Sequence, residues 1–261
     1  ACHHAARYFL LNNRGAIAPG YLADFAIIDN FRNFNVEMVF KKGELYYNDG
    51  KLKDFPAPAI EEYLDERAHD TFHVRHLTEE DFEDVRQRGV IGMIPGEIVS
   101  TDNGYADHVD LQKDILKIAV VERHKNTGHI GLGYIQGYGL KSGAVATSIS
   151  HDSHNIIVVG TNAEDMAFAA NYIVENHGGI VVVDGGKVLA SVVLEIAGIM
   201  SDEPLTKMNE ELEAAKDAAF RLGVSRGIDP FMTLSFMALP VIPTLRITTR
   251  GVIDVNTQQY I

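Results

Sequence analysis

Residues 144–160 have the sequence AVATSISHDSHNIIVVG, which places a dense run of polar side chains between two apolar segments. Residues 144–149 and 156–159 are short and rich in β-branched types, which predicts two buried strands. The polar side chains between them are those of His151, Asp152, Ser153, His154 and Asn155. Such a junction can bind a metal, relay protons or hold a polar ligand. It can equally be a loop whose side chains bond their own backbone, and the residues alone leave both open.

A second polar cluster, Glu122, Arg123 and His124, ends the strand predicted over residues 116–122. It could converge with the first cluster on one edge of a sheet, although a solvated strand end with an ordinary Glu–Arg pair would have the same sequence. The candidate catalytic or supporting residues are Glu122, His124, His151, Asp152 and His154. The candidate substrate-binding residues are Ser153 and Asn155.

The flanking sequence predicts an α+β domain. Further strands are expected at 90–94, 130–135, 180–183 and 188–192, the last two joined by a tight turn at Gly185-Gly186. Glycines alternate with β-forming residues over 128–139, which indicates close backbone approach rather than a phosphate loop. Mixed or antiparallel pairing with packed helices is the expected architecture.

Three helix starts carry capping signals. Thr78 and Asp81 have capping-box spacing, and residues 161–164 predict the same for a helix that runs to 176. A third helix is expected over 204–222, with Pro204 in its first turn, Gly223 after its end, and one apolar stripe. The stripe consists of Leu205, Met208, Leu212, Ala215, Ala219 and Leu222.

The first 60 residues differ in character. A helix is expected over 1–11, followed by short strands at 23–29, 36–40 and 44–47. Three short strands cannot enclose a core, so they must pack on something else. Residues 53–58 contain two prolines and predict an extended linker.

Composition excludes several classes of protein. The chain has 261 residues and a formal net charge of −13, from 36 acidic and 23 basic residues, which argues against nucleic acid and anionic membranes as partners. The single cysteine, Cys2, excludes a disulfide scaffold and suits a reducing, cytoplasmic compartment. No apolar run approaches the ~20 residues of a membrane span. No H-E-x-x-H, P-loop or G-x-S-x-G motif occurs.

Two sets of motifs point to a family. Residues 14–29, RGAIAPGYLADFAIID, resemble the segment with which amidohydrolase-superfamily enzymes begin a small β-sandwich after their catalytic barrel, and residues 39–50 resemble the hairpin that follows. The remaining motifs resemble the extra C-terminal domain of bacterial-type adenine deaminases. They are VERH (121–124), GAVA (143–146), SHDSHNI (150–156), GTN (160–162), MSDEP (200–204) and DPFMTLSF (229–236).

The resemblance implies an enzyme that hydrolyses adenine to hypoxanthine and ammonia with a binuclear iron or manganese site. In that superfamily the metal ligands lie in a (β/α)₈ barrel of roughly 200–250 residues, which the chain does not contain. The implied organisation is 1–14 as the end of the barrel, 15–56 as a partial β-sandwich and 57–261 as the C-terminal α+β domain. The start inside a helix without methionine fits this division.

The expected partners are therefore adenine and an N-terminal barrel portion, and the chain alone is expected to be inactive. Whether it forms a homo-oligomer is left open. Two alternatives also stay open: another amidohydrolase that acts on a different purine or a cyclic amide, and a non-catalytic assembly or binding module.

Overall fold

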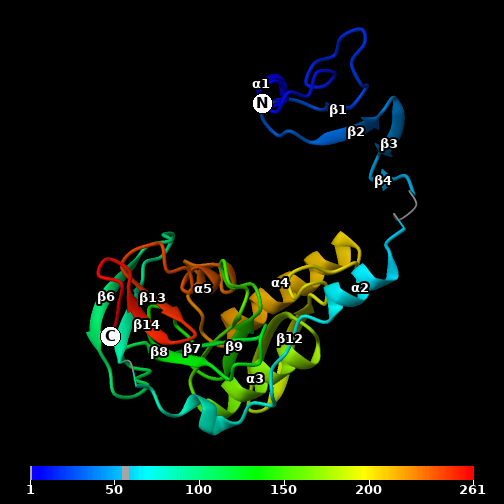
Figure 1. The fold of residues 1–261 in the computed structure, drawn as a ribbon. Helices are drawn as coiled ribbons and strands as arrows, with labels where there is room; N and C mark the ends of the chain where they lie inside the picture. The colour runs from blue at the N-terminus through cyan, green and yellow to red at the C-terminus, as the bar shows by residue number, and fades with distance from the viewer. Residues whose placement is uncertain (1, 55–58, 87) are drawn as a thin grey trace. The chain divides into compact units, whose positions relative to one another are not determined.

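The computed structural model describes residues 2–54, 59–86 and 88–261, and the chain divides into two compact units, Ala1–Ile60 and Glu61–Ile261 (Figure 1). Much of the predicted linker, at residues 55–58, lies outside the described residues, as do the expected domain boundary at 56/57 and the first residue. The assignment of residues 1–14 to a barrel and of 15–56 to a β-sandwich stays a prediction.

The first unit contains helix α1 (Cys2–Tyr8) and an antiparallel sheet with the order β1-β2-β3-β4. The strands are β1 (Phe25–Ile28), β2 (Val36–Lys41), β3 (Glu44–Asn48) and β4 (Lys51–Leu52). The helix and the three expected strands are confirmed; the two-residue β4 follows the turn at Asp49-Gly50 and is too short for a sequence pattern. Ala6 is the only buried side chain among the described residues of this unit.

Asp24 organises the start of this small sheet. Its carboxylate accepts hydrogen bonds from the Lys42 backbone N–H at 2.7 Å and from Lys41 Nζ at 3.0 Å, and it pairs with Arg14. The bonds from Lys42 and Lys41 hold the pKa of Asp24 below its usual value. Asp24, which lies in the segment that resembles amidohydrolases, thus connects the loop before β1 to the β2–β3 turn.

The second unit is built on an eight-stranded sheet with the order β12-β11-β9-β10-β7-β8-β5-β6. Its neighbours are antiparallel except β5 and β8, so the expected mixed sheet is confirmed. The strands are β5 (Gly89–Met93), β6 (Ser100–Tyr105), β7 (Ile115–Val121), β8 (Ile130–Gln136), β9 (Ala144–Thr147), β10 (Ile156–Gly160), β11 (Gly179–Asp184) and β12 (Lys187–Val193).

Both faces of this sheet are covered, which explains its continuous apolar strands. Alternate residues of β7 pack into hydrophobic cores on opposite faces of the sheet. Ile118 and Val120 belong to one core, and Ala119 and Val121 belong to the other. Helix α3 (Ala163–Glu175) and the short 3₁₀ helix η1 (Glu79–Phe82) cover one face, and helix α4 (Leu205–Arg221) the other (Figure 1).

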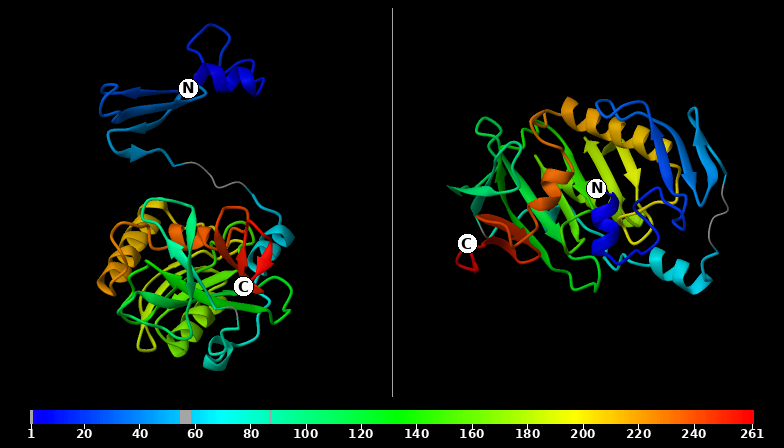
Figure 2. Two further views of the ribbon diagram at one scale, coloured as in Figure 1. Left: turned by 90° about the vertical axis from the view of Figure 1, so that its left-hand side faces the viewer. Right: turned by 90° about the horizontal axis from the view of Figure 1, so that it is seen from above.

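Further short elements complete the second unit. Helix α5 (Met232–Phe236) and the sheet of β13 (Leu245–Thr248), β14 (Gly251–Asp254) and β15 (Gln259–Tyr260) share the core of the α4 face (Figure 2). Helix α2 (Glu62–His69) has no buried residue, in agreement with the charged composition of that stretch. Strand β6 was not expected because its sequence, STDNGY, is polar and lies at the sheet edge.

Two local expectations are wrong. Leu205 does not belong to the buried stripe of α4: it is the first helical residue after Pro204 and is 83% exposed. The cap of α3 is Asn162 with Asp165, one residue later than expected, since the Asn162 side chain accepts from Asp165 N at 2.7 Å. The Asp165 carboxylate also accepts from Gly186 N at 2.8 Å, which ties the start of α3 to the β11–β12 turn.

The glycines of β8 allow the close approach that their spacing predicts. A Cβ added to Gly131 would stand 1.9 Å from the Thr248 carbonyl oxygen, and one added to Gly133 would stand 2.3 Å from Val252 Cγ2. Strand β8 therefore lies directly against the β13–β14 hairpin, and any side chain at Gly131 would push the two apart.

We predict that Gly131→Ala lowers the free energy of unfolding by about 3 kcal/mol, because the new methyl group meets backbone that cannot move aside. Gly104→Ala is the control: Gly104 has a φ of +82° but open space around it, so only the backbone cost of about 1 kcal/mol applies. Urea unfolding followed by circular dichroism measures both. Equal losses would contradict the steric argument.

Candidate functional site

The end of β7 and the start of β10 bring the two polar clusters together. These strands are antiparallel neighbours in which Ile156 pairs with Val121, so residues 122–124 and 151–155 lie at one end of the sheet. The Arg123 backbone N–H donates to Asn155 Oδ1 at 3.2 Å, and His124 Nε2 lies 2.7 Å from the Ser153 carbonyl oxygen. The structure thus shows the convergence that the sequence suggested.

Arg123 is the centre of this junction and is 1% exposed. Its Nε donates to the His154 carbonyl, its Nη1 to the Thr71 carbonyl at 2.8 Å, and its Nη2 to the Ala197 carbonyl at 2.8 Å. The guanidinium also lies over the Phe72 ring, 4.2 Å from its centroid. Burial lowers the pKa of Arg123 to about 10, and the group stays charged at neutral pH. One side chain thereby joins three segments far apart in the chain.

Glu122 is held within the turn that follows β7. Its carboxylate accepts from the backbone N–H groups of His124 at 2.7 Å and Thr127 at 3.1 Å, and from the Thr127 hydroxyl at 2.9 Å. Burial raises the pKa of Glu122, but these hydrogen bonds outweigh it and keep the pKa below its usual value. The contacts explain a structural use of Glu122; a catalytic role stays a prediction.

The two histidines of the loop lie near each other in different surroundings. Their ring centroids are 6.4 Å apart, and the His151 ring packs on Phe236 at 4.7 Å. His151 Nδ1 is 3.9 Å from the Asp152 carboxylate. His154 Nδ1 is buried and has no hydrogen-bond partner among the described residues. Burial, followed by the charges of His151 and Arg123, lowers the pKa of His154.

Helix α5 also contributes residues to this end of the sheet. The His151 backbone N–H donates to the Ser235 carbonyl at 3.3 Å, which places α5 against the loop. Within the described chain, the Ser150 and Ser235 hydroxyls are buried without a partner, like His154 Nδ1. Buried polar atoms are normally hydrogen-bonded, so three such atoms around one loop set this end of the sheet apart from the rest of the core. In the sequence, Ser235 and Phe236 stand in an apolar run, which hides this contact.

The loop does not provide a metal centre. Among residues 2–54, 59–86 and 88–261, no group of three or more His, Cys, Asp or Glu side chains is arranged to hold a metal ion. The donor set of the described residues therefore does not fit a binuclear iron or manganese site.

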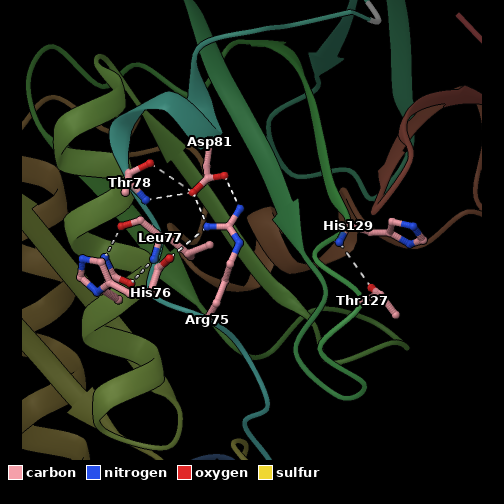
Figure 3. A network of polar contacts seen from close by, with 8 residues as sticks. Arg75, His76, Leu77, Thr78, Asp81, Thr127 and His129 are labelled. Carbon is pink, nitrogen blue, oxygen red and sulfur yellow. Dashed lines mark hydrogen bonds and ion pairs between the residues drawn. The ribbon is translucent and has the colours of Figure 1, made fainter.

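A second polar surface lies around η1 and the connection between β7 and β8 (Figure 3). Thr78 N donates to Asp81 Oδ2 at 2.9 Å, which confirms the expected capping pair, and Arg75 Nη1 donates to the same oxygen at 2.8 Å. A depression of about 460 Å³ adjoins this pair and His129. Its lining mixes acidic and basic side chains: Glu80, Asp81, Asp84, Arg86, His129 and Arg250.

Comparison with known proteins identifies the family. The sequence profile described as "Adenine deaminase C-terminal domain" matches residues 96–259, which include Arg123 and the His151–His154 loop. The chain belongs to this family. The resemblance of the motifs between residues 121 and 236 to this domain is thereby confirmed. The described residues contain no helix long and apolar enough to cross a membrane.

Curated relatives extend the match over almost the whole chain. The adenine deaminase of Nitratidesulfovibrio vulgaris (strain DP4) is 43% identical over 98% of this chain and 46% of its own length. The adenine deaminase of Bacillus subtilis (strain 168) is 40% identical over 99% of this chain and 46% of its own. The chain thus spans about half the length of the curated relatives it matches.

We predict that Arg123→Met lowers the free energy of unfolding of this family member by about 3 kcal/mol or more, because it leaves buried carbonyls of three segments without a donor. Arg86→Met is the matched control: Arg86 forms an exposed ion pair with Asp84, so its loss changes stability by about 0.5 kcal/mol at most. Chemical denaturation compares the two, and equal effects would contradict the role given to Arg123.

The lowered pKa of His154 predicts a pH dependence of stability. The unfolded chain, in which histidine has a pKa of about 6.5, binds the proton more readily than the folded chain. The contribution of neutral His154 is therefore complete above about pH 6.5 and is lost as the pH falls toward the folded-state value. His154→Gln should reduce the drop in unfolding free energy between about pH 7.5 and about pH 5.5.

Exposed His129→Gln serves as the control for this measurement and should leave the wild-type drop unchanged. An undiminished drop in His154→Gln would show that the buried imidazole is not its source.

Proposed function

We propose that the chain is the C-terminal part of a metal-dependent adenine deaminase, a hydrolase that converts adenine and water to hypoxanthine and ammonia. The observation that carries the proposal is the match of 98–99% of the chain to curated adenine deaminases at about 40% identity. The match includes the VERH, SHDSHN and DPFMTLSF motifs, which meet at Arg123 and His151 in the fold.

In this proposal the metal centre and the catalytic barrel belong to the part of the relatives that lies outside these 261 residues. Two observations support it. The described residues provide no ligand cluster. The first unit leaves large apolar side chains uncovered, with Ile17 89% and Phe31 93% exposed, as expected of a half-structure that packs on another segment.

Residues of the junction would support that site rather than bind its metal. His151 and Asp152 have polar side-chain atoms without a protein hydrogen bond among the described residues, and Arg123 and Phe236 fix the loop that carries them. The proposed supporting residues remain Glu122, His124, His151, Asp152 and His154, with Ser153 and Asn155 as substrate-binding candidates. A cytoplasmic role in adenine catabolism completes the proposal, and the exposed free thiol of Cys2 suits it.

The test compares the complete gene product with this chain alone, each supplied with Mn²⁺ or Fe²⁺ and adenine. We expect ammonia release from the complete polypeptide and none from the 261 residues, because the part of the chain that the structure describes has no fitting ligand set. Turnover by the chain alone, or none by the metal-loaded complete polypeptide, would overturn the proposal.

The same assay tests the junction. In the complete polypeptide, His151→Ala and His154→Ala should each lower kcat/KM by about tenfold or more while metal content stays constant. His129→Ala, at the separate polar surface of Figure 3, is the control. Unchanged kcat/KM in both loop variants would leave the loop with a structural role only.

A further inference from the structure

A cavity of about 470 Å³ lies between the His151–His154 loop and the segment that follows α5. Its walls are mainly apolar and come from Val120, Ala238, Leu239, Pro240, Val241 and Ile247. Its polar groups are those of Asp152, Ser153, Asn155, Thr248 and Thr249. This size, with a few polar groups in an apolar frame, is typical of small-molecule sites.

Asn155 provides a built polar group in this cavity. Its residue is 8% exposed, and its Oδ1 accepts from the Arg123 backbone N–H at 3.2 Å, which fixes the orientation of the amide. Its Nδ2 donates to no acceptor in the part of the chain that the structure describes. This nitrogen is not among the buried atoms that lack a partner, so its two N–H groups stay accessible to an acceptor on a ligand.

The charges of the lining define the ligand further. Among the residues that the structure describes, no Lys, Arg or His lines the cavity, and the carboxylate of Asp152 is the only ionisable lining group. A phosphate or carboxylate ligand would meet a negative charge without a cation to offset it. The apolar walls instead favour a neutral ligand, with an acceptor for Asn155 and an N–H for Asp152.

We propose that this cavity binds an uncharged purine-type base, with the base between the apolar walls and its polar edge toward Asn155 and Asp152. The chemistry of the cavity indicates an uncharged nitrogen heterocycle; its identification as a purine rests on the proposed function. Hypoxanthine is the suitable probe, because it offers both a carbonyl acceptor and ring N–H donors and is not consumed by deamination.

The experiment titrates hypoxanthine into the 261-residue chain by isothermal calorimetry. We expect one saturable site. Thr249→Tyr should fill the cavity and weaken hypoxanthine binding by tenfold or more. Asn155→Asp should weaken hypoxanthine binding roughly tenfold, because the substituted side chain keeps the oxygen that accepts from the Arg123 backbone N–H but loses both N–H donors. Thr257→Tyr, on an exposed turn that does not line the cavity, is the matched control and should bind as wild type.

Inosine monophosphate provides the charge test and should bind at least tenfold more weakly than hypoxanthine. The proposal would be overturned by any of three results: no saturable binding to a chain with native circular dichroism, binding of hypoxanthine by both cavity variants as tight as by the wild-type chain, or tighter binding of the nucleotide than of hypoxanthine. The deaminase assay tests the proposed function separately. If the chain binds hypoxanthine but the complete polypeptide does not deaminate adenine, the ligand site stands and the proposed function is wrong. If the complete polypeptide deaminates adenine but the chain does not bind hypoxanthine, only the proposed ligand site is wrong.

Discussion

The buried guanidinium of Arg123 is the interaction on which the functional end of the second unit depends. No carboxylate among the described residues pairs with it; backbone carbonyls of Thr71, His154 and Ala197 surround it instead. A charge in an apolar interior is costly unless fully hydrogen-bonded, so these carbonyls must keep their positions. Gly198 shows how closely the site is fitted, because a Cβ there would stand 2.9 Å from Arg123 Nη2. The segments at 71, 154 and 197 are thus set by one side chain.

The sequence predicts the sheet well because both of its faces are buried. Apolar runs such as those of β7, β9 and β10 are short, contain β-branched residues and are bounded by turn residues, and these features distinguish them from buried helices. Strand β6 and the β13–β15 sheet were not expected, since two to six partly polar residues become strands only through pairing with neighbours. Leu205 shows the same limit in a helix: the periodicity continues past the point where the core ends.

For the candidate site, local sequence indicated the polar loop but not what holds it. The meeting of residues 122–124 with 151–155 follows from two adjacent antiparallel strands, a relation that strand order can suggest. The contacts of Arg123 with residues 71 and 197 and of His151 with α5 span dozens of residues and have no local signal. Asn155 and Ser153 were singled out as polar loop residues, whereas the apolar cavity beside them comes from residues 238–247, which resemble ordinary core.

At the junction, main-chain hydrogen bonds hold the loop, whereas the polar side chains of the loop remain available. The loop is held by its backbone: Arg123 donates to the His154 carbonyl, His124 contacts the Ser153 carbonyl, and His154 N–H donates to the Ser150 carbonyl at 2.6 Å. Hydrogen bonds to main-chain groups hold the loop in place, and the side chains of Asp152 and Ser153 form no hydrogen bond with the described residues. A loop fixed in this way holds its polar side chains in defined positions, and these side chains remain free to form hydrogen bonds with a ligand. That combination is what a ligand-binding loop requires, because pre-organised donors and acceptors lose little entropy when a ligand binds.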